Sequence, residues 1–447
     1  MNHHPEKMPS PYLSLVPVGV LVGLLFYTIR IFGNDTLEGA SQMVLLIATA
    51  VCSLIALTCC GIRWNTIETA IVHNITSVSS ALLILLLIGA LSGSWMIGGV
   101  IPTLIYYGVQ IIHPDYFLAS TCVICSLVSL MTGSSWTTVA TIGIALAGIG
   151  KVQGFSDGWI AGAILSGAYF GDKISPLSDT TVLAASVTET PLFRHIRYML
   201  ITTLPSLTIA LLIFLVAGFF HESTSSGEIN EFTHALGKTY HISLWLLLVP
   251  LLMSVLIAKK VSPLITLFLS AIAAGVAALV FQPGILHHLS GLNTANVASL
   301  FKGLLRAFYD HTQMDTGNAT LDGLTATRGM AGMMDTIWLI ICAMCFGGAM
   351  TASHMLESIT SVILRYMKRT ASVVAGTAFS GLFLNICTAD QYLSIILTGN
   401  MFKNVYKQKG YESRLLSRTI EDSTTVTSPL IPWNTCGMTQ SAVLGIS

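Results

Sequence analysis

The stretch Gly-Ala-Tyr-Phe-Gly-Asp-Lys-Ile-Ser-Pro-Leu-Ser-Asp-Thr-Thr, residues 167–181, interrupts an apolar run that extends from about residue 159 to residue 187. Without the interruption, the run would be long enough to cross a lipid bilayer. Asp172, Lys173 and Asp179 lie inside it, and one charge at the centre of a bilayer costs roughly 2.5–3.5 kcal/mol. An ion pair between Lys173 and Asp172 would offset part of this cost, but Asp179 would remain uncompensated.

The backbone at the same point also opposes a continuous helix. Pro176 has no backbone N–H donor and disfavours helical geometry at Ser175. We therefore predict two half-helices that meet at a broken, hydrated centre. Non-helical backbone at this depth is tolerated only inside protein or beside a water-filled cavity. The alternative is a loop between two short core helices of a soluble protein.

The composition of the whole chain favours the membrane interpretation. The 447 residues are 53% hydrophobic and 9% charged, with a mean hydropathy of +0.74, which is not typical of a soluble globular protein. The net charge is zero and no basic patch is present, so neither a nucleic acid nor an acidic partner is indicated. We expect an all-α polytopic membrane protein, surrounded by lipid.

Two other chemistries receive little support. The sequence contains no nucleophile–base pair and no zinc-ligand spacing, so we do not expect an enzyme. Two Cys-x-x-Cys pairs, Cys122/Cys125 and Cys342/Cys345, lie in apolar helical stretches without a neighbouring ligand histidine. We interpret these cysteines as small packing residues.

The apolar segments divide the chain into membrane spans and connecting loops. A polar-flanked stretch at 64–74 and polar loops at 221–240 and 283–334 separate the spans, and the last of these loops is expected to form a surface lid or short helices. The expected membrane segments are 12–32, 42–62, 75–112 with a broken second part, 115–150, 158–188, 198–220, 242–258, 262–282, 335–352, 370–402 and 415–446.

The two halves of the chain resemble each other. Ser-Pro-Leu at 175–177 recurs at 428–430, an offset of 253 residues, and Asp-Thr-Thr at 179–181 is echoed by Asn-Thr at 434–435. Interrupted segments at corresponding positions of two halves are typical of a transporter's binding site. Further matches at offsets of 254 or 255 are Leu91 with Phe346, Val100 with Met355, and Asp115 with Arg369.

The distribution of basic residues orients these halves, because cytoplasmic loops are enriched in Lys and Arg. Segment 370–402 has basic residues at both ends, so we predict a hairpin that enters from the cytoplasm and returns to it. Its counterpart, 115–150, would then have both ends outside. The result is two repeats of inverted topology, 1–220 and 241–447, joined by an external loop at 221–240, with a second external loop at 283–334. The basic clusters assigned to the cytoplasm are 63, 194–197, 259–260, 365–369 and 403–414, and the loop at 33–41 is assigned to the outside.

Four breaks are expected to converge near the middle of the membrane: 132–138, 172–181, 385–391 and 421–435. Their side chains are almost all oxygen donors, which suit hard cations rather than soft metals. The candidate ion- or substrate-binding residues are Ser135, Thr137, Thr138, Asp172, Ser175, Asp179, Thr180, Asn385, Thr388, Asp390, Glu421, Asp422, Thr424, Ser428, Asn434 and Thr435.

The carboxylates among them could also exchange ions. A carboxylate that holds either Na⁺ or H⁺, but not both, is the simplest exchanger, and we place Na⁺ at Asp172, Asp179 and Asp390 as a hypothesis. For each carboxylate the alternative is a helix cap or a salt bridge. Asp179 could cap the second half-helix, and Glu421 could lie on the surface. Many of the Ser and Thr residues could cap half-helices as well.

These motifs resemble those of the NhaC-type Na⁺/H⁺ antiporter family, to which malate/lactate-type sodium antiporters also belong. The resemblance rests on 167–181 followed by Arg-His-Ile-Arg-Tyr-Met at 194–199, and on 101–108, 133–138 and 421–435. It covers nearly the whole chain and implies the ion transporter superfamily, in which paired hairpins and broken helices form a mobile substrate-carrying unit. Family members usually continue past the second break with a further apolar stretch, whereas this sequence ends at Ser447. The resemblance therefore predicts a shortened or absent terminal span.

The resemblance implies secondary active transport across the bacterial cytoplasmic membrane, in which sodium moves one way and protons move the other. No cofactor is expected, since Na⁺ and H⁺ are the transported ions, and a homodimer is one candidate assembly. The same breaks would serve an exchanger of small carboxylates, coupled to Na⁺ and H⁺, in which half-helix N-termini grip the carboxylate. A passive channel is a third alternative, but broken, charge-bearing helices in two inverted repeats favour alternating access.

Overall fold

The computed structural model describes residues 9–32, 39–221, 226–294, 296–314, 316, 319–365 and 369–446. Throughout these ranges the regular elements are helices, and an isolated antiparallel bridge joins Thr312 to Thr327. Nine of the described helices are long and apolar enough to cross a membrane, and a bent pair could form a tenth span. The protein is therefore an all-α polytopic membrane protein. Most of the loop expected at 33–41, and Lys368 of one basic cluster, lie outside the described residues.

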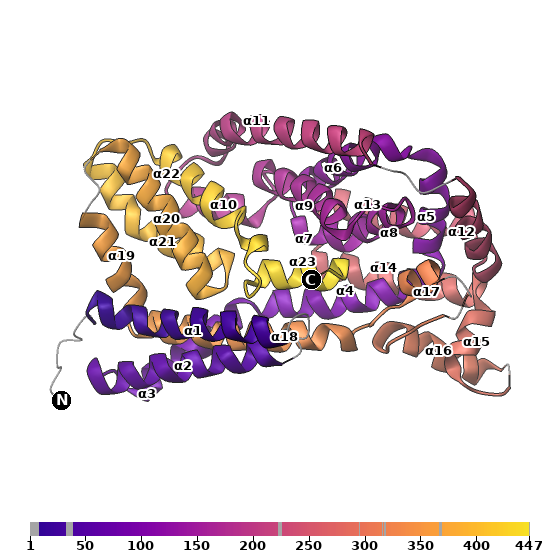
Figure 1. Ribbon diagram of the computed structural model, residues 1–447, viewed down its shortest axis with the longest axis horizontal. Coiled ribbons are helices and arrows are strands. Elements are labelled where there is room, and N and C mark those ends of the chain that lie inside the picture. The colour runs from indigo at the N-terminus through magenta and orange to yellow at the C-terminus, as the bar shows by residue number, and fades with distance from the viewer. Residues whose placement is uncertain are drawn as a thin grey trace.

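One long edge of the molecule is formed by helices from both halves of the chain (Figure 1). These are α1 (Pro11–Phe32), α2 (Ala40–Cys59), α3 (Trp64–Ser77) and α18 (Met334–Ala352). The polar-flanked stretch 64–74 lies within the helix α3. Its buried stripe, Ile67 and Asn74 with the half-buried Ile71 between them, faces α18, where Gly348 leaves room for close approach.

The break expected after residue 92 lies between α4 (Ser79–Ile97) and α5 (Val100–Ile111). Gly99 has φ 80°, a left-handed conformation that favours glycine. The chain can therefore turn between two apolar helices without a strained side chain.

Segment 115–150 forms a hairpin. Its first arm is α6 (Pro114–Thr132), and its second arm consists of α7 (Ser135–Thr138), η2 (Val139–Gly143) and α8 (Ile144–Val152). The open ends of the two arms meet, because the Gln153 side chain donates to the Ile112 carbonyl at 2.7 Å. Phe117 and Phe155 stack beside them, with ring centroids 5.3 Å apart.

Segment 370–402 forms a second hairpin, made of α20 (Thr370–Thr388) and α21 (Gln391–Gln408). Its open ends also meet, since the Thr370 and Tyr411 hydroxyls are 2.8 Å apart and those of Thr377 and Tyr406 are 3.2 Å apart. Each predicted hairpin is therefore present, and each has its two ends on one side of the molecule.

The two predicted broken segments are also present. The first consists of α9 (Asp157–Ile174) and α10 (Asp179–Val187), with the break at 175–178. The second runs through α22 (Ser413–Ile420), the π-helical turn η5 (Glu421–Thr425), the 3₁₀ turn η6 (Ser428–Leu430) and α23 (Thr435–Leu444). The broken segments lie beside the hairpins in the middle of the molecule (Figure 1).

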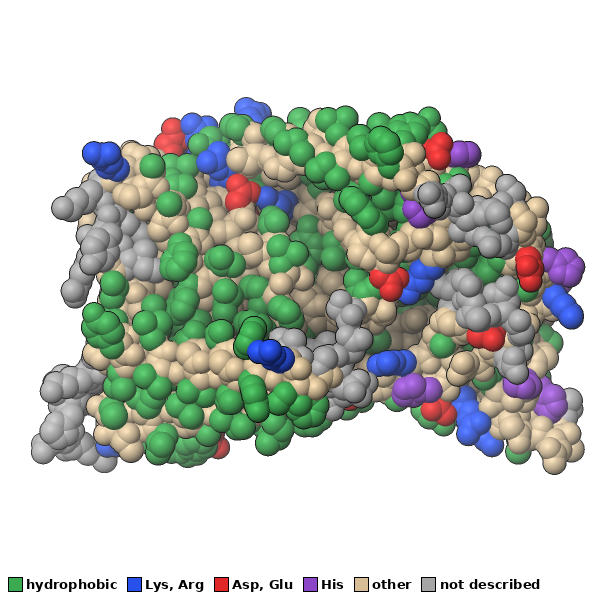
Figure 2. All heavy atoms as spheres, viewed as in Figure 1, with side chains coloured by type: hydrophobic (Ala, Val, Ile, Leu, Met, Phe, Trp, Pro, Cys, Tyr) green, Lys and Arg blue, Asp and Glu red, His purple; other side chains and the backbone are tan. Residues whose placement is uncertain are grey.

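The remaining helices surround this centre. They are α11 (Leu192–Phe219), α12 (Ser226–Thr239), η3 (Leu244–Leu247), α13 (Leu248–Ala258), α14 (Pro263–Phe281), α15 (Pro283–Ser290), α16 (Val297–Tyr309), α17 (Ala319–Thr325), η4 (Ala331–Met333) and α19 (Met355–Arg365). Segment 283–334 holds short helices, as one of our two expectations stated. Large apolar side chains cover the outer face of α11, where hydrocarbon would contact it (Figure 2).

The prediction of a loop at 221–240 is wrong. Most of that segment is α12, which meets α13 at a bend of 89°. Phe232, Leu236 and Tyr240 recur every four residues and are buried. This helical periodicity was overlooked because the residues between them are polar and charged.

Candidate functional site

The tip of the first hairpin is a tight turn that presents hydroxyl groups. Gly133 has φ 68°, and a Cβ atom there would lie 2.6 Å from the Leu177 carbonyl carbon, so glycine is required by both conformation and space. Ser134 caps α7 by accepting a hydrogen bond from the Thr137 N–H at 3.2 Å. The first hairpin tip therefore lies directly against the break in the first broken segment.

The tip of the second hairpin repeats this turn. Ala389 has φ 57°, and Asp390 caps α21 by accepting from the Leu393 N–H at 2.8 Å. The same two hydrogen bonds occur in both tips. The backbone N–H of the cap residue, Ser134 or Asp390, donates to the threonine hydroxyl two residues earlier. The backbone carbonyl of the cap residue accepts from the hydroxyl four residues later. The corresponding positions are numbered 132, 134 and 138 in one tip and 388, 390 and 394 in the other, a constant difference of 256.

Asp172 lies between the first tip and the first break. Its side chain is buried, and one carboxylate oxygen accepts from the Ser135 hydroxyl at 2.6 Å and the Ser135 N–H at 3.2 Å. The other oxygen accepts from the Ser178 hydroxyl at 2.5 Å. Three donors thus hold one carboxylate where a helix ends and a hairpin turns.

The second tip and the second break are joined mainly by amides. The Asn385 side chain donates to Ser428 at 3.0 Å and to the Thr424 carbonyl at 2.9 Å, and Asn434 donates to the Asn385 side-chain oxygen at 2.9 Å. Thr435 closes the group, since its N–H donates to the Ala389 carbonyl at 2.8 Å and its hydroxyl donates to Asp390 at 3.3 Å.

The two halves of the site meet around α23. Gln440 of α23 donates to the Tyr169 hydroxyl of α9 at 3.5 Å. Cys436 interacts with Tyr169 and with Trp136 of the first hairpin, and Tyr392 of the second hairpin lies within electrostatic range of Asp172 and Asp390. The four breaks therefore converge, as predicted.

Lys173 does not pair with Asp172, which corrects our expectation. Its ammonium nitrogen lies 2.5 Å from Asp422 Oδ1, and only 7% of its side chain is exposed. Asp422 also accepts from the Thr202 hydroxyl at 3.1 Å and lies 4.0 Å from the Arg418 guanidinium. The ion pair therefore joins the first broken segment to the second.

Glu421 is fully buried, not on the surface. In the described part of the chain neither of its carboxylate oxygens accepts a hydrogen bond, and the nearby Thr425 hydroxyl does not make one of normal geometry. Its charged neighbours are Lys173, Asp172 and Asp422. An ionised carboxylate in this position would cost several kcal/mol, so a proton or a cation is needed there.

Several other candidate residues are exposed or make only local hydrogen bonds. Asp179 is exposed and does not cap α10, because Ser178 is the cap. Ser175 donates to the Leu130 carbonyl at 2.9 Å, and Thr180 shares a hydrogen bond with Ser178 at 3.0 Å. The hydroxyls of Thr137, Thr138, Thr388 and Thr424 all bond within the tips or turns that carry them.

Sequence reasoning missed Ser178, Tyr169 and Tyr392. Ser178 was recognisable, because a serine before Asp-Thr-Thr fits the N-cap pattern of a new helix. The two tyrosines carried no local signal, since they come from elements that meet only in the folded chain. Within the described residues no three His, Cys, Asp or Glu side chains form a metal-binding group. A hard cation would therefore be held by single carboxylates together with hydroxyl and backbone oxygens.

The fold and site together define a helical membrane transporter, in which two hairpins and two broken helices enclose buried polar groups. A family model described as the Na⁺/H⁺ antiporter family matches residues 10–182 and 167–447. The chain belongs to this family, and it is a multi-pass protein of the cell membrane.

Three relatives illustrate the range of the family. The chain is 36% identical to the Na⁺/H⁺ antiporter NhaC of Alkalihalophilus pseudofirmus over 99% of its length and 91% of the relative's. It is 34% identical to the malate-2H⁺/Na⁺-lactate antiporter of Bacillus subtilis, over 99% and 90% of the two chains. It is 32% identical to the arginine/ornithine antiporter ArcD of Halobacterium salinarum, over 99% and 88%.

Proposed function

We propose that this protein is a transporter, not an enzyme, that exchanges Na⁺ for H⁺ across the cell membrane by alternating access. The observation that carries the proposal is the buried Asp172 carboxylate, which three donors hold at the junction of a hairpin tip and a helix break. A carboxylate in this position can bind a cation or a proton. The Asp172 and Lys173 carbonyls at the α9 C-terminus accept from the Thr181 hydroxyl at 3.1 Å, and the second lone pair of each oxygen could add a ligand.

The proposed coupling uses two neighbouring carboxylates. Na⁺ would occupy the oxygen-rich surroundings of Asp172 and compete with a proton for the same charge. Glu421, within electrostatic range of Asp172, would bind a proton in the sodium-free state and release it when sodium occupies the Asp172 site. Lys173, paired with Asp422, would keep a fixed positive charge beside both groups. Asp179 and Asp390 remain further candidates for sodium in this scheme.

The proposed topology supports alternating access. The matched hairpin tips agree with two repeats, 1–220 and 241–447, and the charge bias agrees with their inverted orientation. Because α12 occupies most of 221–240, the external connection between the repeats contains a helix. Rocking of one unit against the other would expose the centre to each side in turn.

The direct test is Na⁺-driven proton movement in proteoliposomes that contain the full chain. Asp172→Asn keeps the size and polarity of the side chain but removes its charge, so coupled exchange should be abolished. Asp157→Asn is the matched control, because Asp157 begins the same helix and is 53% exposed in a surface pair with Lys151. Rates are normalised to folded protein in the membrane. Near-normal exchange by Asp172→Asn would refute this site.

A second candidate function is Na⁺- and H⁺-coupled exchange of small carboxylates. It is favoured by the N-termini of α10 and α23 at the centre, which Ser178 and Asn434 cap, and by the malate/lactate relative. Helix N-termini attract anions. If flux requires a carboxylate on one side, this function replaces the first, whereas flux that is independent of imposed gradients and does not saturate would indicate a channel.

A further inference from the structure

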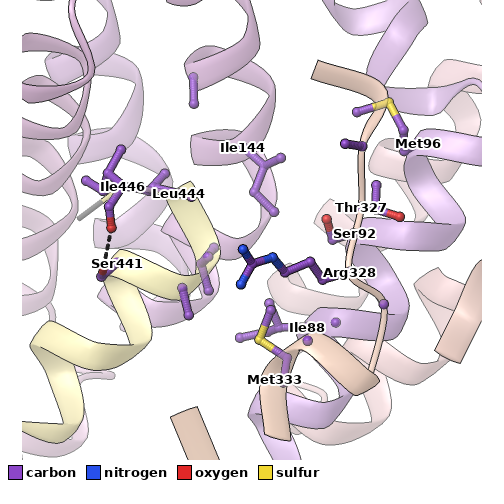
Figure 3. Close-up of a pocket in the computed structure, with 18 of the residues that line it drawn as sticks. Ile88, Ser92, Met96, Ile144, Thr327, Arg328, Met333, Ser441, Leu444 and Ile446 are labelled. Atoms are coloured by element: carbon purple, nitrogen blue, oxygen red, sulfur yellow. Dashed lines mark hydrogen bonds between the residues drawn. The ribbon is translucent and has the colours of Figure 1, made fainter. Parts of the chain in front are cut away.

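A cavity of about 490 Å³ lies beside α23, beginning one helical turn after the break at the N-terminus of that helix. Its walls come from α4, α8, the start of α18 and segment 323–336, and its floor is the C-terminal half of α23 (Figure 3). This volume falls in the range of pockets that bind small organic ligands. The residues of α23 that line the cavity run from Met438 to Leu444, and no residue of the four breaks is part of its lining.

Arg328 is an exposed residue that brings a positive charge to this cavity. Its side chain points into the space between Ile144 and α23 (Figure 3). Among the described residues, no carboxylate lies within ion-pair distance of it. Lys151 also lines the cavity, but it lies 3.4 Å from Asp157, and Asp335 lines it without pairing to Arg328.

The backbone that carries Arg328 is held firmly in place. Thr312 and Thr327 exchange two backbone hydrogen bonds of 2.8 Å, and the Gly332 N–H donates to the Arg328 carbonyl at 2.9 Å. Gly329 lies directly on α4, where a Cβ atom at Gly89 would be 2.5 Å from its carbonyl oxygen. The backbone at Arg328 is therefore fixed before any ligand arrives, so binding has to order only the side chain.

We propose that this cavity binds the carboxylate of a small organic acid, with the Arg328 guanidinium as its anchor. A guanidinium presents parallel N–H donors that match the two oxygens of a carboxylate. The apolar walls, which include Ile88, Met96 and Ile144, suit the carbon skeleton of such an acid, and Ser92 offers a hydroxyl.

The proposed topology places this cavity on the outer face of the membrane. Outer loops are poor in Arg and Lys, so an arginine directed into an outer cavity runs against the charge bias and indicates a specific use. This inference rests on the second candidate function, the exchange of small carboxylates, because a carboxylate bound in this cavity would be a substrate that enters from outside. Because none of the polar groups of the four breaks lines this cavity, it would be a first binding site, not the place of exchange.

Isothermal titration calorimetry with the full-length protein in detergent tests the proposal without requiring transport. Potassium malate and potassium lactate are titrated at constant ionic strength, with potassium phosphate and potassium chloride as comparison anions. We expect at least one carboxylate to bind in preference to phosphate and chloride. Arg328→Gln should weaken that binding by at least about tenfold, and Arg328→Lys should weaken it less, because charge remains but the paired donors are lost.

Lys302→Gln is the matched control. It removes one positive charge from the exposed face of α16, near the same segment but outside the cavity, and should leave carboxylate affinity unchanged. Equal binding of phosphate and malate, no carboxylate binding to the parent protein, or unchanged affinity in Arg328→Gln would each overturn the proposal. A protein that does not exchange Na⁺ for H⁺ would still give the same calorimetric result for carboxylate binding. The exchange proposal and the binding proposal can therefore be refuted independently.

Discussion

At the scale of single residues, the site contains carboxylates in very different surroundings. Asp172 accepts three hydrogen bonds, whereas Glu421 accepts none from the described residues although both are buried. Asp422 is 32% exposed and is paired with Lys173. These contacts decide which group can exchange an ion and which has a structural role. Sequence position alone could not separate them, because Glu421 and Asp422 are adjacent.

The Lys173–Asp422 pair should couple the stability of the two broken segments. We expect Lys173→Gln and Asp422→Asn to destabilise the protein individually, because each leaves a charge in a largely buried place. The double variant should lose less than the sum, with a coupling of about 1–3 kcal/mol. Denaturant unfolding in detergent measures the free energy of unfolding of the parent, the two single variants and the double variant. If the effects of the two single changes add up to that of the double change, the ion pair does not contribute to stability.

The exposed Lys403–Glu189 pair is the control for this cycle. It has the same 2.5 Å separation, but 69% of the Glu189 side chain is exposed, so its coupling should be the smaller of the two. The hydrogen bond and charge of Lys403 lower the pKa of Glu189. The contribution of this pair should therefore be present at neutral pH and be lost as acidification protonates Glu189.

At the scale of elements, the hairpin tips explain both a success and a failure of sequence reasoning. The Gly-Ser-Ser-Trp-Thr-Thr stretch predicted the first tip through its glycine and hydroxyls, and the polar run at 385–391 predicted the second. The spans and breaks followed from hydropathy and proline, which act locally. The α12 helix and the Lys173 partner could not be found in this way, because the first needs periodicity through polar residues and the second needs tertiary contact.

Substitutions at the two tips should have effects of opposite sign. Gly133→Ala should destabilise the protein by about 1–3 kcal/mol, because a left-handed backbone and contact with Leu177 both oppose a Cβ atom. Ala389→Gly, at the matching position of the second tip, should be neutral or stabilising because it relieves that strain. Thermal unfolding in detergent compares them, and equal destabilisation by both changes would contradict this view of the turns.

The hairpins also predict which membrane face each segment end reaches. Cysteines introduced at Ala371 and Asn404 should both react with a membrane-impermeant reagent only from the cytoplasmic side. Cysteines at His113 and Ser156 should react only from outside. All four residues are exposed, and Cys59, an exposed native cysteine, is first replaced by serine. Labelling of one hairpin's ends from opposite faces would contradict the inverted topology.

At the scale of the whole molecule, the two halves contribute different chemistry to one centre. The first half supplies Asp172 and Lys173, whereas the second supplies Glu421 and Asp422 and a cluster built on Asn385. The backbone of the hairpin tips repeats closely, but the charged residues do not. Offsets between short sequence matches predicted the repeat, whereas the asymmetry of charge emerged only from the packed helices. An exchanger can use that asymmetry if one group binds sodium while another releases its proton.

Competition between sodium and protons is the property that this arrangement predicts for the whole transporter. Protonation neutralises the Asp172 carboxylate, so apparent sodium affinity should fall about tenfold for each pH unit below the pKa of the site. The measurement is the sodium concentration for half-maximal exchange in proteoliposomes, across pH values set equally on both sides. Glu421→Gln stays neutral and has no exchangeable proton, so it should slow exchange, while Asp172 still gives sodium binding its pH dependence. A parent protein whose sodium affinity is flat across this pH range must bind the two ions at separate sites.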